Sequence, residues 1–394
     1  MRARTIIYLD RFLRNFHAVK ARIGQIGYQS RICVPVKADA YGHGALEIAK
    51  ISQEAGAFCL GVATVTEGTE LRKGGINIPI LLFSQSHPDD IPEIIKAGLV
   101  PFISDEEFAS ALNKQAEIKK CILPVHLKID TGMGRLGCRA EEALSLARHI
   151  DGCSSLDLAG TATHFAVSDS TDEQDIAYTL EQLSCFQEAV SAIRSAGIDP
   201  GIVHAANSGA VILHPDSWLD MVRPGIFLYG YKTVEESGAP SDLRQKLSAF
   251  EPLQAQPVME LKTVVSMIKK VKKGESVSYG RTWTAPQDTH IAVLSLGYGD
   301  GFPRLASNKW QVVIGGKAYP LVGRITMDQC CADLGPDTDI RRWKEAVIFG
   351  GSAKDAAALA DVVGTIPYEI TCNINKRVPR VYEAYGVQFR EMQQ

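Results

Sequence analysis

The chain has 394 residues, which is longer than one hydrophobic core usually supports, so its length predicts two domains. It carries 42 lysines and arginines against 45 aspartates and glutamates, and this net charge of -3 argues against a nucleic-acid or membrane-surface partner. The first residues hold too few apolar side chains for a signal peptide or a membrane span. We therefore expect a cytoplasmic protein that acts on a small molecule.

Short apolar runs alternate with longer amphipathic segments from residue 11 to about 232. Such runs, rich in β-branched residues, are typical of parallel strands that are buried on both faces. Eight of them occur, at 31–38, 57–64, 78–84, 99–104, 122–129, 158–166, 201–207 and 221–230. Eight strand–helix units of this length predict an α/β fold with a (β/α)8 TIM-like barrel over residues 11–240.

The clearest predicted helix spans 172–193, where apolar residues recur at three- and four-residue steps. Thr171 and Gln174 predict a capping box at its start, and Gly197 predicts its end. The residues expected on its buried face are Ile176, Leu180, Leu183, Phe186, Val190 and Ile193.

The pattern changes after a crossing segment at 233–256, which contains two prolines. Beyond it, short β-branched runs are separated by glycine and aspartate turns, with one helix-like piece at 353–363. This texture predicts a second, mainly β domain over 241–394, to which we also assign residues 1–10.

The most informative stretch is VPVKADAYGHG at 34–44, where Lys37 ends an apolar strand. Barrel enzymes carry their active sites at the carboxyl ends of the strands, and burial there lowers the pKa of an amine. A neutral amine attacks an aldehyde to form a Schiff base. The alternative is a surface lysine whose amine reaches water.

VKADAYGHG resembles the cofactor-lysine motif of the alanine racemases, and the similarity continues through nearly the whole chain, in eight segments from residue 34 to 372. The resemblance implies that Lys37 carries pyridoxal 5'-phosphate as an imine and that Tyr41 binds its phosphate. It also implies interconversion of L- and D-alanine, with no metal ion. Ordinary packing is the alternative role for Tyr41.

LKIDTGMGRLG at 127–137 is similar to the family segment whose arginine faces the substrate. The resemblance therefore places Arg135 near the substrate carboxylate, which a guanidinium binds through paired hydrogen bonds. Lys128 corresponds to a family lysine that is often carbamylated. An unmodified lysine paired with an acid is the alternative.

Three further strand ends complete the cofactor site that the resemblance implies. Its members are His164 against the pyridine ring, Ser208 and Asn207 at the phosphate, Arg223 at the pyridine nitrogen, the backbone of Gly225 and Ile226 near the phosphate, and Tyr368 as phosphate contact and gate. The alternatives are a core histidine for His164, a plain N-cap for Ser208 and a structural salt bridge for Arg223.

Arg223 has a chemical consequence if it faces the ring nitrogen. A permanent cation there disfavours protonation of the pyridine, which makes the ring a weaker electron sink. We therefore expect a short-lived carbanion that is reprotonated promptly, with transamination and decarboxylation suppressed.

SVSYGRTW at 276–283 resembles the family segment that bears the second catalytic group, Tyr279. Lys37 and Tyr279 would then serve opposite faces of a planar intermediate, as racemisation requires. A nearby cation, Arg281 or Arg135, is needed to lower the pKa of the phenol. The resemblance also makes the backbone of Met327 a carboxylate donor, puts Tyr298 at the entrance, and implies a homodimer that shares its sites.

Three alternatives remain at this stage. A broader racemase on the same scaffold would act on serine or basic amino acids, although a bulky Tyr368 favours alanine. A barrel decarboxylase would present an acid to the pyridine nitrogen in place of Arg223. A non-catalytic cofactor carrier would not need Tyr279 or the second domain.

Overall fold

Eight parallel strands surround one axis, and each is a short run dominated by apolar residues that are buried. The computed structural model describes residues 2–25, 29–384 and 387–388. The strands are β2 (Arg31–Pro35), β3 (Cys59–Val62), β4 (Ile80–Leu82), β5 (Val100–Ile103), β6 (Leu123–Asp130), β8 (Leu156–Ala162), β9 (Ile202–His204) and β10 (Met221–Val222). Each falls within or overlaps its predicted run, so the eight-strand prediction is confirmed.

The parallel sheet runs in the order β10-β2-β3-β4-β5-β6-β8-β9, with the short β7 (Cys138–Arg139) paired to β6. Two backbone hydrogen bonds join its ends: Asp220 N–H donates to Val203 O at 3.0 Å, and Arg223 N–H donates to Ala206 O at 2.8 Å. The strands therefore form a nearly closed barrel, as the strand count predicted.

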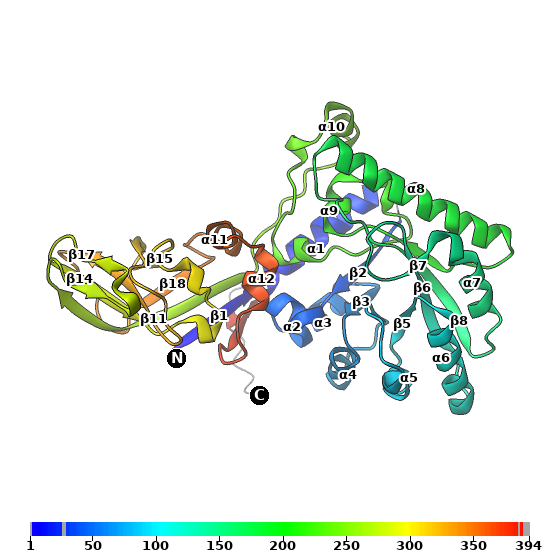
Figure 1. Ribbon diagram of the computed structural model, residues 1–394, viewed down its shortest axis with the longest axis horizontal. Coiled ribbons are helices and arrows are strands. Elements are labelled where there is room, and N and C mark those ends of the chain that lie inside the picture. The colour runs from blue at the N-terminus through cyan, green and yellow to red at the C-terminus, as the bar shows by residue number, and fades with distance from the viewer. Residues whose placement is uncertain (1, 26–28, 385–386, 389–394) are drawn as a thin grey trace.

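Helices cover the outside of the barrel (Figure 1). They are α1 (Leu9–Gly24), α3 (Ala45–Glu54), α4 (Val65–Lys73), α5 (Ile91–Ala97), α6 (Glu106–Lys119), α7 (Ala143–Asp151), α8 (Glu173–Ser195) and α9 (Ser208–Leu213). The predicted helix is α8, with two differences. Its N-cap is Asp172, whose carboxylate accepts the N–H groups of Gln174 and Asp175, and Leu180 is exposed.

The last predicted strand, 221–230, is mostly not a strand. After β10 the chain forms η5 (Ile226–Tyr229), a 3-10 turn that begins at Gly225. Pro224 has no N–H to donate to a neighbouring strand, and this ends the ladder. The break turns the chain inward at the carboxyl end of the barrel.

A second, nine-stranded sheet lies beside the barrel (Figure 1). Its strands are β1 (Ala3–Tyr8), β11 (Met259–Val271), β14 (Thr289–Leu294), β15 (Gln311–Ile314), β16 (Lys317–Pro320), β17 (Cys330–Gly335), β18 (Glu345–Phe349), β19 (Arg380–Ala384) and β20 (Val387–Gln388). The amino-terminal β1 pairs antiparallel with β11 and parallel with β19. The prediction of a mainly β part after the barrel is confirmed.

Short elements complete this half of the chain: α10 (Ser241–Leu247), the hairpin β12 (Ser276–Val277) and β13 (Trp283–Thr284), α11 (Ala356–Val363) and α12 (Pro367–Cys372). The helix-like piece predicted at 353–363 corresponds to α11. No helix within the described ranges combines the length and apolarity needed to cross a membrane.

One buried asparagine joins the two halves of the molecule. Asn15 on α1 is 1% exposed; its Nδ2 donates to Leu228 O at 3.0 Å and to Gln256 O at 2.9 Å. Its Oδ1 accepts the N–H of Gln256 at 2.9 Å. The segment that crosses to the second sheet is therefore fixed to α1 and to η5.

Candidate active site

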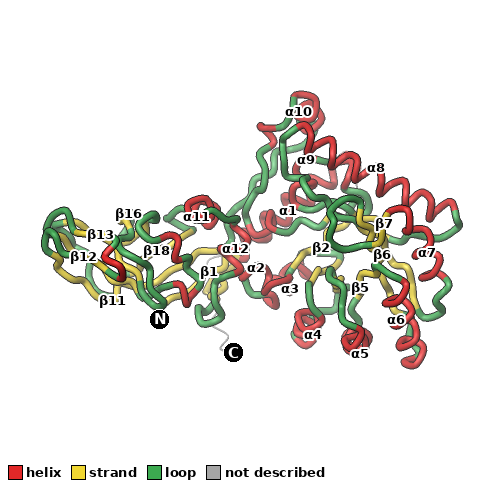
Figure 2. The backbone as a smooth tube through the Cα atoms, viewed as in Figure 1, coloured by secondary structure: helices red, strands yellow, loops and turns green. Residues whose placement is uncertain are grey.

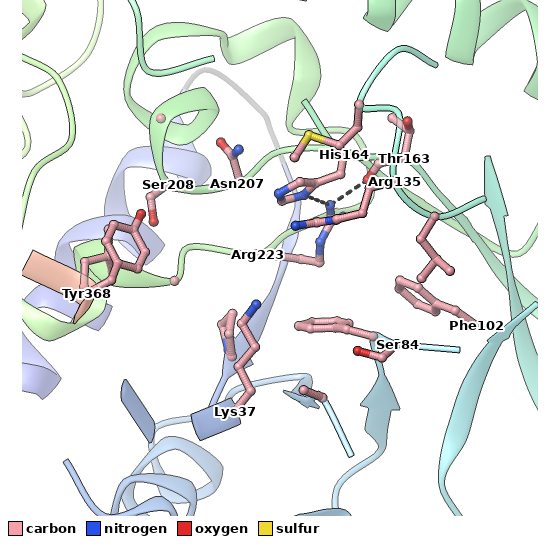
Figure 3. A pocket seen from close by; sticks show the side chains of 18 of the residues that line it. Lys37, Ser84, Phe102, Arg135, Thr163, His164, Asn207, Ser208, Arg223 and Tyr368 are labelled. Atoms are coloured by element: carbon pink, nitrogen blue, oxygen red, sulfur yellow. Dashed lines mark hydrogen bonds between the residues drawn. The ribbon is translucent and has the colours of Figure 1, made fainter. Parts of the chain in front are cut away.

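A cavity of about 460 Å³ opens at the carboxyl ends of the barrel strands. All but two of the predicted site residues line it, although they come from distant parts of the sequence (Figure 3). They are Lys37, Tyr41, Arg135, His164, Asn207, Ser208, Arg223, Gly225, Ile226 and Tyr368. Lys128 also lines the cavity, whereas Tyr279 and Met327 do not.

Lys37 follows β2 and extends into the cavity (Figure 3). Its Nζ has no hydrogen-bond partner among the described residues. Burial lowers the pKa of Lys37, and the nearby cation of Arg135 lowers it further. The amine is therefore poised to react in its neutral form, as expected for a lysine that attacks an aldehyde.

The chain after Lys37 forms one turn of left-handed helix. Residues 38–41 have φ between 52° and 56°, although none of them is glycine. This conformation costs roughly 1–2 kcal/mol for each L residue, so neighbouring contacts must stabilise it. Asp39 Oδ1 accepts the N–H of Ala45 at 2.9 Å, and Arg380 Nε donates to Gly42 O at 3.1 Å. The turn directs the Tyr41 side chain back toward the cavity.

Tyr41 lies at one end of the cavity, beside the start of η5. A Cβ atom on Gly225 would stand 2.7 Å from the Tyr41 hydroxyl, so only glycine allows this approach. The backbone N–H groups of Gly225 and Ile226 have no acceptor among the described residues, and Ser208 and Tyr368 line the same cavity. Free backbone N–H groups at the start of a turn, together with hydroxyls, suit a phosphate.

Asn207 lines the cavity, and the oxygen of its side chain already has partners within the chain. Its Oδ1 accepts the N–H of Ala210 at 3.1 Å and the hydroxyl of Ser168 at 2.7 Å, which makes Asn207 the N-cap of α9. Ser208 is thus the first residue of the helix and not its cap. Its hydroxyl faces the N–H of Phe227 at 3.3 Å.

Arg223 is buried and bonded to the barrel interior. Its Nη1 donates to His204 Nδ1 at 2.6 Å, and its Nη2 donates to the carbonyl oxygens of Thr163 and Ala205 at 2.7 and 2.9 Å. Nη2 also lies 3.3 Å from His164 Nδ1. No carboxylate of the described chain pairs with Arg223, so it is not the structural salt bridge considered above. Burial lowers its pKa to about 10, which leaves it cationic at neutral pH.

Two histidines of this network were not singled out from the sequence. A guanidinium only donates, so His204 Nδ1 accepts, and the proton on His204 Nε2 points to His126 Nδ1 at 2.8 Å. Burial lowers the pKa of His126 to about 3 and that of His204 well below its usual value, so both are neutral. The signal was available: His126 lies two residues before Lys128, and alternate residues of a strand share a face.

Lys128 and Arg135 lie on the side of the cavity across from β2. The carboxylate of Asp130 accepts the N–H groups of Gly132, Gly134 and Arg135 at 2.9, 3.1 and 3.0 Å and so shapes the loop that carries Arg135. Burial and the charge of Arg223 lower the pKa of Lys128 to about 7. No described acid forms an ion pair with Lys128.

Tyr279 lies between β12 and β13, and Met327 lies between β16 and β17. Their side chains are 72% and 53% exposed. Figure 2 shows β12 and β13, which flank Tyr279, far along the molecule from the barrel strands. Tyr298, 43% exposed, lies close to Met327, because Gly299 N–H donates to Met327 O at 2.9 Å. A single chain therefore leaves these side chains outside its own cavity.

Comparisons with known proteins agree along the whole chain. Residues 7–233 match the model of the alanine racemase N-terminal domain, and 258–382 match that of the C-terminal domain. An alanine racemase from Treponema denticola is 46% identical over 97% of this chain and 98% of its own. The structure of alanine racemase from Clostridium difficile 630 superposes with a TM-score of 0.89 at 34% identity, over 100% of this chain and 98% of that one. An alanine racemase from Bartonella henselae with covalently bound pyridoxal phosphate gives 0.82 at 25% identity, over 97% and 100%.

Proposed function

Because the chain belongs to the alanine racemase family, we propose that it interconverts L- and D-alanine with pyridoxal 5'-phosphate as cofactor. The observation that carries this proposal is the cavity, where a partly buried and unpaired Lys37 amine faces Arg223 and a set of free N–H groups. No observation favours the alternative of a racemase with broader specificity, since the relatives compared are alanine racemases.

The residues of the cavity fit this cofactor. The free N–H groups of Gly225 and Ile226 beside the Tyr41 hydroxyl suit a phosphate, and Lys37 suits an aldehyde. Arg223 Nε has no partner in the described part of the chain and remains free to donate to a ring nitrogen. When bound, the cofactor supplies an electron sink that stabilises negative charge at the substrate Cα.

Each catalytic residue then has one task. The Lys37 amine exchanges a proton with the Cα atom on one face, and the Tyr279 hydroxyl does so on the other. Arg135 binds the substrate carboxylate through its guanidinium, helped by the backbone N–H of Met327. Arg223 stays protonated, and its charge would disfavour a proton on the ring nitrogen and so limit side reactions.

We further propose a homodimer whose partner chain supplies Tyr279 and Met327 to the cavity of the first. Their exposure, and their position outside the cavity of their own chain, support this arrangement. Arg281 follows Tyr279 by two residues, and its Nε donates to Ser276 Oγ at 2.8 Å. It is the cation that we propose for the phenol.

Three finer statements remain proposals. The domain division lies at residue 240, with residues 1–10 assigned to the second domain; the pairing of β1 with β11 supports this assignment. The protein acts in the cytoplasm. Its D-alanine serves cell-wall peptidoglycan.

The direct test is incubation of the purified protein with L-alanine and pyridoxal phosphate. We expect D-alanine until both enantiomers are equal, with no carbon dioxide released. Borohydride reduction followed by peptide mapping is expected to locate the cofactor on Lys37. Carbon dioxide in place of D-alanine would favour the decarboxylase, and a labelled but inactive protein would favour the carrier.

Carbamylation of Lys128 is a separate proposal with its own prediction. The neutral amine reacts with carbon dioxide, and the pKa of Lys128 is lowered to about 7 by burial and by Arg223. We therefore expect the carbamate to build up as the pH rises through 7, because the amine then loses its proton. The cations of Arg135 and Arg223 stabilise the negative charge of the carbamate. Carbon-13 NMR with labelled bicarbonate measures this signal, and Lys128→Met provides the control. A signal absent at pH 8 contradicts the proposal.

A further inference from the structure

Glu67, in the first turn of α4, binds three backbone N–H groups from two neighbouring strand ends. Its Oε1 accepts the N–H of Ala38 at 2.7 Å. Its Oε2 accepts the N–H groups of Ala63 and Thr64 at 2.8 and 3.2 Å. The carboxylate thus connects the chain that follows β2 with the chain that follows β3. Glu67 is partly buried and does not line the cavity itself.

The hydrogen bond to Ala38 fixes the backbone directly after Lys37. Ala38 is the first residue of the left-handed turn, and its N–H belongs to the peptide that follows Lys37. The Lys37 amine itself has no hydrogen bond to the described residues, so its location depends on the backbone that carries it. In the reaction the amine must stay on one face of the substrate, where a displacement of ~1 Å costs on the order of 100-fold in rate.

The charge of Glu67 also acts on the Lys37 amine. Burial and the cations of Arg135 and Arg223 lower the pKa of Lys37, whereas Glu67 and the thiol of Cys372 raise it. Glu67 is the only carboxylate among these groups, which come from the β6–β7 loop, the segment after β10, α4 and α12. Glu67 therefore counteracts the effect of the two arginines on the pKa of Lys37 and favours the protonated amine.

We propose that Glu67 is a positioning residue for Lys37, which holds the peptide after the lysine and supplies the negative charge that faces its amine. This inference rests on the proposed racemisation, in which the amine both gives and takes a proton. Glu67 acts through Lys37 and does not touch the substrate.

The test compares Glu67→Gln with Thr64→Ala. Thr64 Oγ1 accepts the N–H of Glu67 at 3.2 Å and forms the other half of the capping box, but it does not bind Ala38. Both variants weaken the start of α4, and only Glu67→Gln removes the charge and alters the contact with Ala38. Thr64→Ala therefore controls for a purely structural effect.

Two measurements use the protein freed of cofactor. In Glu67→Gln, hydrogen exchange of the peptide spanning residues 36–41 is expected to become faster. The pH midpoint for uptake of pyridoxal phosphate by Lys37 is expected to move to lower pH, because the amine loses a stabilising carboxylate. In the loaded enzyme kcat is expected to fall roughly 10-fold while KM changes less than about 2-fold.

Thr64→Ala is expected to lower the unfolding temperature and leave the exchange, the pH midpoint and kcat close to wild type. If Glu67→Gln behaves like Thr64→Ala in all three, the inference is overturned. If the wild type takes up cofactor on Lys37 but does not racemise alanine, the proposed function fails, while exchange and the pH midpoint still decide the role of Glu67.

Discussion

Mixing two inactive variants, Lys37→Ala and Tyr279→Phe, is expected to restore about a quarter of wild-type racemisation if each site is built from two chains. Tyr279 is 72% exposed and lies outside the cavity that holds Lys37, so the proposed pair of catalytic residues requires a second chain. Random reassociation makes half of the dimers hybrid. In each hybrid, one of the two sites combines an intact Lys37 with an intact Tyr279.

The variants alone set the baseline for this experiment. Lys37→Ala loses the cofactor attachment, and Tyr279→Phe is expected to keep the absorbance of lysine-bound cofactor while racemisation falls roughly 100- to 10,000-fold. D-alanine formation is measured after the chains are separated in mild denaturant and returned to buffer. Activity no higher than that of each variant treated alone would show that the two residues act within one chain or not at all.

The second large effect is expected at Arg223, whose charge we propose to control the outcome of the reaction. Replacing it with glutamine keeps a hydrogen-bonding group but removes the cation, so a ring nitrogen facing residue 223 gains a proton more easily. We expect racemisation to fall roughly 100-fold and pyruvate from transamination of alanine to rise relative to D-alanine. A coupled assay for pyruvate, run beside the D-alanine assay, measures this ratio.

Arg223→Lys separates charge from geometry. It keeps the cation but loses the fork that binds His204 and the carbonyl of Thr163, so it is expected to lower the rate without raising the share of pyruvate. Both variants leave buried acceptors unsatisfied, at a cost of about 1–3 kcal/mol for each group, and should unfold at lower temperature. A pyruvate share that rises equally in both variants would contradict the role given to the charge.

Much of the fold follows from local pattern. The eight barrel strands and α8 were predicted because buried strands and amphipathic helices have distinct periodicities. The cluster of residues around Lys37 was predictable because the carboxyl ends of parallel strands meet at one end of a barrel, and because the motifs resemble one family.

What the sequence did not reveal depends on contacts between distant segments. The His126–His204 pair joins two strands that are not neighbours in sequence, and neither histidine stands out in its own run. Asn207 and Asp172 took the capping roles considered for Ser208 and Thr171, since neighbouring polar residues compete for the same N–H groups. The exposed Leu180 shows that periodicity alone does not define a buried face.

The left-handed turn after Lys37 is the clearest example. Ala38, Asp39 and Ala40 have no strong preference for positive φ, so no local signal predicts it. Tertiary contacts impose the conformation: Glu67 holds its start, and Arg380, from the second sheet, holds the oxygen of Gly42 at its end. The conformation is thus a property of the whole molecule.

Selection of this protein for thermal stability is expected to conflict with its catalytic activity at this turn. Glycine at position 38 or 40 relaxes the backbone, and a library scored only on survival at high temperature should be enriched in it. The same replacements give the backbone that carries Lys37 more conformational freedom. Heat-tolerant clones from such a library should therefore be ranked by turnover as well, because the rigidity that they lose is the rigidity that positions Lys37.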